Sequence, residues 1–171
     1  MAKVAALDAI ALLKADHRKL ERLFEKFQSA KNDDKKKSLA EQICLELTAH
    51  TKIEEDVFYP ACKGEIDDDL WREAYVEHDG AKVMIAEIEH GNPGDEFYDA
   101  KVKVLSEMIK HHVKEEERRA EGMFAQARAS GLDTEVLGAR MLAEKAALIA
   151  EYTANGVPKP PTLTFTGTKL A

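Results

Sequence analysis

Apolar residues recur at steps of three and four along most of the chain, and short polar breaks separate these stretches. This period predicts amphipathic α-helices whose apolar stripes face a shared core. The first stripe follows Asp8, a suitable N-cap, and continues to about Ala30. Its members are Ile10, Leu13, His17, Leu20, Phe24 and Phe27. A histidine therefore occupies a core position of the first predicted helix.

Three further stripes predict three more helices of the same kind. The second helix is expected from about Lys37 to Tyr59, where Pro60 should end it. The third lies between the acidic run at 67–69 and the break at 91–94, and Gly122 is expected to bend or interrupt the fourth. These stripes contain Ile43, Leu47, His50, Glu54 and Phe58; Trp71, Ala74, His78, Ala81, Ile85 and Ile88; and Val102, Leu105, Ile109, His112 and Glu116.

A fifth helix is predicted from about Thr134 to Thr153, and the prolines after Gly156 favour an extended tail. We therefore predict an all-α fold, an antiparallel up-down four-helix bundle with an appended C-terminal helix and an extended tail. The expected division places the bundle in residues 1–130. Residues 131–171 then form the appended helix and the proline-rich tail, which pack on the bundle.

Composition and charge restrict the class of protein. The 171 residues suit one domain, and the net charge of −7 disfavours a nucleic-acid partner, which would require a basic surface. No apolar stretch is long enough to cross a bilayer, so we expect no membrane association and a cytoplasmic location. Cys44 and Cys62 are too few to form a disulfide framework in a chain of this size.

Two motifs carry the chemistry of the chain, His50-Thr-Lys-Ile-Glu54 and His112-Val-Lys-Glu-Glu116. Each places an imidazole and a carboxylate four residues apart, on one face of a helix. A lone histidine on an apolar stripe is usually a core residue with one hydrogen bond. Burying four imidazoles beside two carboxylates is costly unless a cation binds them. The predicted metal ligands are His17, His50, Glu54, His78, His112 and Glu116.

The ligand types favour iron or manganese, because imidazole and carboxylate without thiolate suit these metals better than copper(I) or structural zinc. Several neighbours remain open as ligands. His111 and Glu115 share the same four-residue spacing, and Glu55 adjoins Glu54. Tyr59 and Tyr75 could approach a metal, although core packing is the favoured role for both.

The order of these motifs resembles the hemerythrin-like, or HHE cation-binding, family. The resemblance rests on Asp16-His17, His50-x-x-x-Glu54, Glu77-His78 and His112-x-x-x-Glu116, and it covers about residues 8–128. It implies a four-helix bundle around two iron ions, ferrous or ferric and bridged by an oxo or a hydroxo group. The six ligands carry over position by position, with Glu54 and Glu116 as the bridges.

One departure from the oxygen-carrying members of that family bears on function. Those proteins place two histidines four residues apart on their third helix, whereas the residue four after His78 is Lys82. The chain therefore looks like the bacterial or mycobacterial branch, and the departure favours handling of hydrogen peroxide, as a catalase does, or of nitric oxide. Reversible binding, storage or sensing of dioxygen is the alternative, and a purely structural metal is a third. The expected partners are these small molecules, and the protein should be a monomer or a homodimer.

Overall fold

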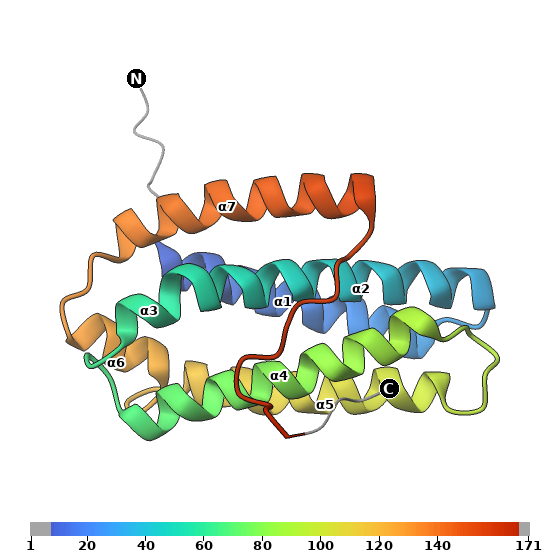
Figure 1. The fold of residues 1–171 in the computed structure, drawn as a ribbon, viewed down its shortest axis with the longest axis horizontal. Helices are drawn as coiled ribbons and strands as arrows, with labels where there is room; N and C mark the ends of the chain where they lie inside the picture. The colour runs from blue at the N-terminus through green and yellow to red at the C-terminus, as the bar shows by residue number, and fades with distance from the viewer. Residues whose placement is uncertain (1–7, 168–171) are drawn as a thin grey trace.

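The computed structural model describes residues 8–167, and it contains only helices and connecting segments in that range. Four long helices form a bundle (Figure 1). They are α1 (Ala9–Ser29), α2 (Asp33–Ile53), α4 (Asp68–His90) and α5 (Tyr98–Glu117). Each helix packs against its two neighbours in the closed order α1, α2, α4, α5. The predicted all-α bundle is confirmed.

The start of α1 follows the sequence closely. The side chain of Asp8 accepts a hydrogen bond from the backbone N–H of Ala11 at 2.9 Å, which satisfies an otherwise unpaired donor of the first turn. The apolar stripe then lies against the bundle, and all of its predicted members are buried. His17 is 2% exposed, as its place on this stripe requires.

The prediction that Pro60 ends the second helix is wrong. After α2 the chain widens into one π-helical segment, η1 (Glu54–Phe58), and continues as α3 (Tyr59–Cys62). The backbone N–H of Tyr59 bonds to the carbonyl of Glu54, five residues back. Pro60 stands in the first turn of α3, where proline is tolerated because the N–H groups of a first turn have no partner within their own helix. The preceding π turn lets the helical chain continue through Pro60 to Cys62.

Gly122 interrupts the last part of the predicted fourth helix. Helix α5 ends at Glu117, the backbone of Arg118 is extended, and the short helix α6 (Met123–Ala129) begins after Gly122. A Cβ atom at Gly122 would lie 2.5 Å from the carbonyl oxygen of Arg118, closer than any side chain tolerates. The sharp turn between α5 and α6 therefore requires glycine.

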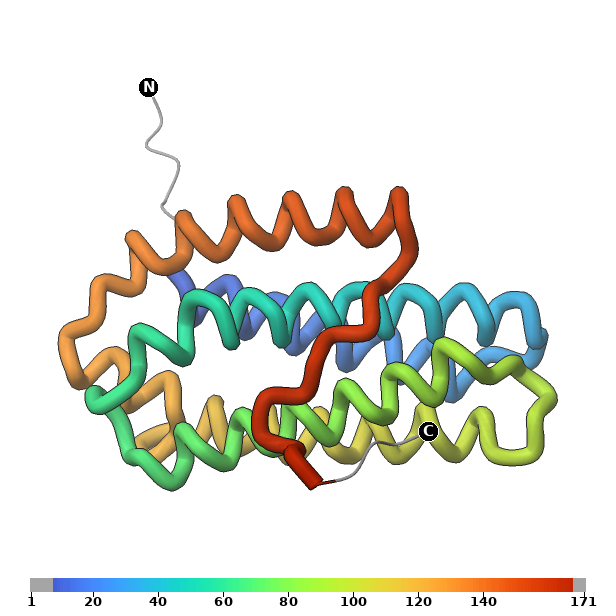
Figure 2. The backbone as a smooth tube through the Cα atoms, viewed as in Figure 1, coloured from blue at the N-terminus to red at the C-terminus, as the bar shows by residue number. Residues whose placement is uncertain are grey.

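The C-terminal part adds a helix and a tail to the bundle. Helix α7 (Thr134–Asn155) packs against α1 and α2, and residues 156–167 continue without regular structure. Figure 2 shows this tail, in red, crossing the side of the bundle over α4. The division of the chain at residue 130 remains a prediction. Among residues 8–167, no helix is long and apolar enough to cross a membrane.

The apolar core is divided into two clusters, and the division falls at the histidines. In α1, Leu13 belongs to one cluster and Leu20 to the other, with His17 between them. The same change occurs across His50 in α2 and across His78 in α4, where the flanking core residues are Leu47 and Ile53, and Ala74 and Ala81. A polar layer therefore crosses the middle of an otherwise apolar interior.

Candidate metal centre

All six predicted ligands lie in this polar layer. They come from four helices and the π turn, and none is more than 4% exposed. His17 is on α1, His50 on α2 and His78 on α4; Glu54 is the first residue of η1; His112 and Glu116 are on α5. The sequence thus identified residues that the fold brings together. Their role as ligands remains a prediction.

The ligand atoms form two groups that share a carboxylate. In His17, His50 and Glu54, one ligand atom of each residue lies within 4.8 Å of the other two, and the same holds for Glu54, His78 and His112. Glu54 Oε2 lies 3.3 Å from Nε2 of His50 and 3.2 Å from Nε2 of His78. One carboxylate is therefore placed between two pairs of imidazoles.

Glu116 spans the same two groups from the opposite side of the layer. Its Oε2 lies 3.3 Å from Nε2 of His17, and its Oε1 lies 3.5 Å from Nε2 of His112. The two imidazoles of the second group, His78 and His112, have their Nε2 atoms 3.3 Å apart. Imidazole nitrogens cannot all donate hydrogen bonds to one another, so a bound cation is needed to satisfy lone pairs that lie this close.

The hydrogen bonds within the layer are incomplete. Both carboxylate oxygens of Glu54, Oε2 of Glu116 and Nε2 of His17 are buried without a hydrogen-bond partner among residues 8–167. Buried polar atoms are rarely left in this state, and each one destabilises the fold. The unpaired atoms are carboxylate oxygens and an imidazole nitrogen, which are ligand atoms suited to a transition metal, so the residues present fit a pair of bound ions.

Each of the four imidazoles is also held from behind by a carboxylate on its Nδ1 atom. The four residues, called here the outer carboxylates, are Asp16, Glu55, Glu77 and Glu117. Their oxygens lie between 2.6 Å (Glu77 on His112) and 3.2 Å (Asp16 on His50) from the ring nitrogens. A carboxylate on Nδ1 keeps that nitrogen protonated and leaves Nε2 free to bind a metal.

The outer carboxylates link the helices in a ring. Asp16 of α1 holds His50 of α2, and Glu55, which continues α2 in η1, holds His78 of α4. Glu77 of α4 holds His112 of α5, and Glu117 of α5 returns to His17 of α1. Each outer carboxylate adjoins a predicted ligand in the sequence, yet it serves the imidazole of another helix. Sequence reasoning missed this ring, although the acidic neighbours of the ligands were visible.

The charges of the layer shift its titrating groups in opposite directions. Burial raises the pKa of Glu54 well above its usual range, and the nearby carboxylate of Glu116 adds to this. Burial opposes ionisation of Glu116 too, but the imidazoles of His112 and His17 hold its pKa at about 2. Burial lowers the pKa of His78 well below its usual range, with the charge of His112 adding to it. A neutral His78 keeps its Nε2 lone pair available to a metal.

Tyr59 packs in the core, as the sequence favours, and its hydroxyl also contacts the predicted ligands. Its ring is fully buried. The hydroxyl donates to Glu116 Oε1 at 3.0 Å and lies 3.1 Å from Nε2 of His78. The π turn accounts for this position, because it makes residues five apart, such as Glu54 and Tyr59, neighbours along the helix. Tyr75 packs edge-on against the Tyr59 ring.

His111 and Glu55, which the sequence leaves open as ligands, lie outside the ligand layer. The side chain of His111 is 60% exposed and contacts Glu77 and Glu115 at the surface, away from the ligand atoms. Glu55 holds the Nδ1 side of His78, opposite to the side that faces Glu54. Lys82 is buried and forms an ion pair with Glu55 at 2.8 Å, so it stabilises an outer carboxylate.

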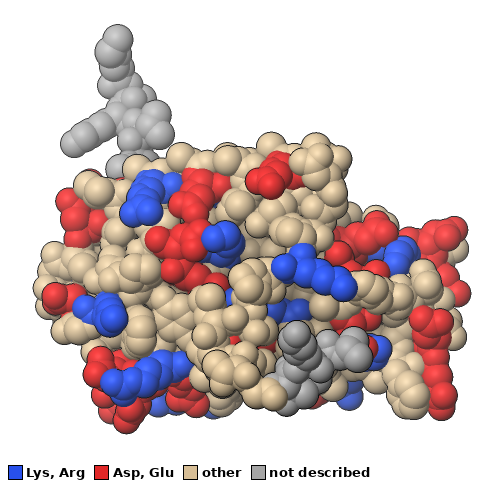
Figure 3. Space-filling view, in the orientation of Figure 1, with Lys and Arg blue, Asp and Glu red and all other residues tan. Residues whose placement is uncertain are grey.

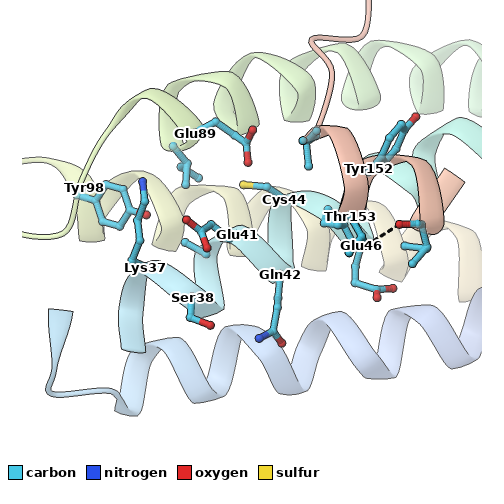
Figure 4. A pocket seen from close by; sticks show the side chains of 16 residues that line it. Lys37, Ser38, Glu41, Gln42, Cys44, Glu46, Glu89, Tyr98, Tyr152 and Thr153 are labelled. Atoms are coloured by element: carbon cyan, nitrogen blue, oxygen red, sulfur yellow. Dashed lines mark hydrogen bonds between the residues drawn. The ribbon is translucent and has the colours of Figure 1, made fainter. Parts of the chain in front are cut away.

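Access to the layer comes from two small cavities. One of about 250 Å³ reaches His17 between α1 and α5, and one of about 240 Å³ reaches His78 and His112 between α4 and α5. A larger cavity, of about 650 Å³, lies elsewhere, between α2, α4 and α7 (Figure 4), and none of the six residues lines it. Each of the two cavities is large enough to hold a molecule of a few atoms.

Comparisons with known proteins show the family and the fold of the chain. A family model described as the Hemerythrin HHE cation binding domain matches residues 8–124. A crystal structure of a hemerythrin HHE cation binding domain-containing protein, the Rv2633c homologue from Mycobacterium kansasii, superimposes with a TM-score of 0.73 at 22% identity, and the match covers 88% of this chain and 94% of that one. A protein of Nostoc sp. named DNA nickase is 28% identical over 106 residues, 62% of this chain but 30% of the Nostoc protein.

Proposed function

Because this chain belongs to the hemerythrin HHE cation-binding domain family, we propose that it is a non-haem di-iron protein that decomposes hydrogen peroxide. The donor set supports two ions. His17 and His50 would hold one, His78 and His112 the other, and Glu54 and Glu116 would contact both. Two iron ions would supply the redox chemistry by which two molecules of hydrogen peroxide become one dioxygen and two waters.

The protein's own groups would provide a site shielded from water and a hydroxyl that donates a hydrogen bond. Burial raises the pKa of Tyr59 well above its usual range, and the charges of Glu116 and Glu54 add to this. The hydroxyl therefore stays protonated. It donates to Glu116 in the structure, so it would donate to a small oxygen-containing molecule beside His78 by exchanging that hydrogen bond. The two apolar clusters on either side exclude bulk water from the layer.

Lys82 is the single observation that favours peroxide chemistry over oxygen transport. A second histidine at this position would add an imidazole to the His78 group, whereas Lys82 forms ion pairs with Glu55 and Asp79. The group keeps only two imidazoles beside its carboxylates. Oxygen-anion ligands stabilise ferric iron, which disfavours reversible dioxygen binding. The same chemistry is compatible with nitric oxide as a substrate, and reversible binding or sensing of dioxygen is the second candidate.

Reconstitution separates these functions. The metal-free protein is loaded with ferrous iron without air, the ions per chain are counted, and oxygen is then admitted while the visible spectrum is followed. Irreversible oxidation, together with oxygen release from added peroxide, supports the proposal. A band that disappears on degassing supports carriage, and full activity of the metal-free protein contradicts any role for the metal.

The ligand assignment has its own test. His50→Ala and His112→Ala each remove an imidazole from a different group, so each should lose an ion. The control is His90→Ala, since His90 is exposed at the end of α4 and its imidazole contacts the backbone carbonyl of Ala86. Two ions retained in both buried-site variants would show that the assignment is wrong. Native metal analysis by mass spectrometry would show whether iron or another metal binds.

The name of the Nostoc protein raises a nucleic-acid role, and we propose that this chain has none. The matched segment covers 30% of that protein, so its activity can lie in the remainder. The net charge here is −7, and on the face drawn in Figure 3 the basic side chains are interspersed with acidic ones. Supercoiled plasmid should stay intact in the presence of the iron-loaded chain, and nicked plasmid would contradict the proposal.

A further inference from the structure

The cation that holds Glu55 is more deeply buried than those that hold Glu117 and Asp16. The side chain of Arg18 on Glu117 is 48% exposed and that of Lys145 on Asp16 is 13% exposed, whereas that of Lys82 on Glu55 is 3% exposed. Lys82 Nζ lies 2.8 Å from Glu55 and 3.2 Å from Asp79 Oδ1. A buried cation between two carboxylates fixes all three side chains, because moving one leaves a charge unpaired.

Asp79 is in turn held by the C-terminal tail. The backbone N–H groups of three consecutive residues, Leu163, Thr164 and Phe165, donate to its carboxylate. The Thr164 hydroxyl donates as well, at 2.7 Å, and Lys82 donates to the carbonyl of Pro161 at 3.3 Å. Asp79 is 0% exposed, so the tail supplies donors that water would otherwise provide. A run of backbone N–H groups of this kind is a strong anion site.

The tail makes these polar contacts with little apolar burial. Leu163 remains 53% exposed and Phe165 44% exposed. A cavity of about 310 Å³ separates residues 157–160 from the side of α4 at Ile85 and Ala86. The tail therefore crosses α4 (Figure 2) without packing tightly on it, and its contacts with Asp79 and Lys82 account for its position.

We propose that residues 157–167 form a strap that positions Glu55 on His78 through Asp79 and Lys82, and so determines how firmly the His78 and His112 group holds its ion. The inference rests on the proposed function, since it needs a pair of bound ions. In this arrangement Lys82 is a positioning residue. Because coupling between two sites is reciprocal, a bound ion should also hold the strap in place.

The test measures how fast iron leaves the loaded protein when a chelator is added. Removing residues 157–171 should speed the loss of one ion about tenfold and leave the other unchanged. Loss of a partner of a metal-bound histidine weakens metal affinity by about 10- to 100-fold, and the strap acts on that partner indirectly. Lys82→Met should do the same, and the two changes together should add little, since they act through one contact. The control removes only residues 168–171.

A point substitution covers the case in which the truncated protein does not fold. Thr164→Pro removes the N–H and the hydroxyl that bind Asp79, whereas Thr166→Pro alters a neighbouring exposed residue without that contact. Only the first should speed iron loss. Hydrogen exchange at residues 163–165 should be slower in the loaded wild-type protein than in the metal-free one.

Two results would contradict the strap proposal, and both can be distinguished from a failure of the proposed function. If the wild-type protein binds two ions and the truncated, Lys82→Met and Thr164→Pro proteins release them at the wild-type rate, the strap proposal is wrong while the metal centre stands. Equal exchange at residues 163–165 with and without iron would also overturn it. If the wild-type protein binds no pair of ions, the proposed function itself fails.

Discussion

Glu117 accepts a hydrogen bond from Nδ1 of His17 at 2.7 Å, across 100 positions of the chain. This contact closes the ring of outer carboxylates, because it joins the last bundle helix to the first. The imidazole of His17 also lowers the pKa of the Glu117 carboxyl, which therefore stays ionised. The charge should strengthen the imidazole as a ligand.

Glu117→Gln should weaken iron binding by the group that contains His17, since glutamine can accept the hydrogen bond but carries no charge. We expect about a tenfold loss of affinity for one of two ions, measured by competition with a chelator. Glu115→Gln is the matched control, because the histidine that Glu115 contacts, at 3.6 Å, is the exposed His111. Equal losses in the two variants would contradict this role.

Tyr59→Phe should change catalysis without changing the number of ions. The substitution keeps the buried ring and removes the hydroxyl that lies 3.0 Å from Glu116. If this hydroxyl donates a proton or hydrogen bond to peroxide, turnover should fall about a hundredfold. The measurement is oxygen release beside iron content, and Tyr75→Phe serves as the control. Wild-type turnover in Tyr59→Phe would exclude the role, and loss of an ion would make Tyr59 a ligand.

The two thiols should resist modification in the native protein. Burial raises the pKa of Cys62 to about 12, and burial beside Glu89 raises that of Cys44. Cys44 lines the cavity of about 650 Å³ (Figure 4), yet it is 1% exposed. An aromatic disulfide reagent at pH 8 should therefore release no thiolate signal from the folded protein, because the thiolate is the reacting form. Two equivalents should appear in denaturant, and rapid reaction of the native Cys44→Ser variant would show that Cys62 is accessible.

Asp8 should contribute stability that depends on pH. It caps α1 and also binds Arg128 of α6 and Thr134 of α7. Although burial opposes ionisation, the bond from the Ala11 N–H and the charge of Arg128 hold the pKa of Asp8 below its usual range. A lowered pKa means that the contribution is complete above about pH 4 and disappears as the pH falls below it.

The measurement is the free energy of unfolding of Asp8→Ala against the wild type at several pH values. We expect a loss of about 1 kcal/mol at pH 7. The difference should shrink toward pH 3, because the pH then lies below the ordinary pKa of an aspartate and Asp8 of the unfolded chain takes up a proton. Comparing the two proteins at each pH cancels the titration of the metal ligands, which they share. A difference that stays constant from pH 7 to pH 3 would show that the ionised form of Asp8 is not what stabilises the fold.

The sequence predicts the helices and the six converging residues well, because both depend on the helical period. His17 and His78 lie on apolar stripes, and a stripe must face the core whatever the details of packing. The place of Tyr59 does not follow from this period. It depends on a single π turn, whose energetic cost is recovered through contacts that form only in the folded bundle.

The outer carboxylates and the strap show the same limit. Asp16 adjoins His17 in sequence, but which imidazole it holds depends on how α1 lies beside α2. In the sequence, Lys82 is notable only because it occupies a position where the oxygen-carrying proteins have a histidine. Its function follows from its buried contacts with Glu55 and Asp79. The donors for Asp79 are backbone groups of the tail, and no side-chain pattern reports them.

The closed ring has a consequence for biosynthesis. During translation α1, α2 and α4 leave the ribosome before α5, and until α5 arrives His17 lacks Glu117 and the His78 group lacks His112. The emerging chain can offer a metal at most an incomplete set of donors. Only a finished domain presents the full pair of binding groups, so iron that reaches the chain early should exchange away rather than be trapped.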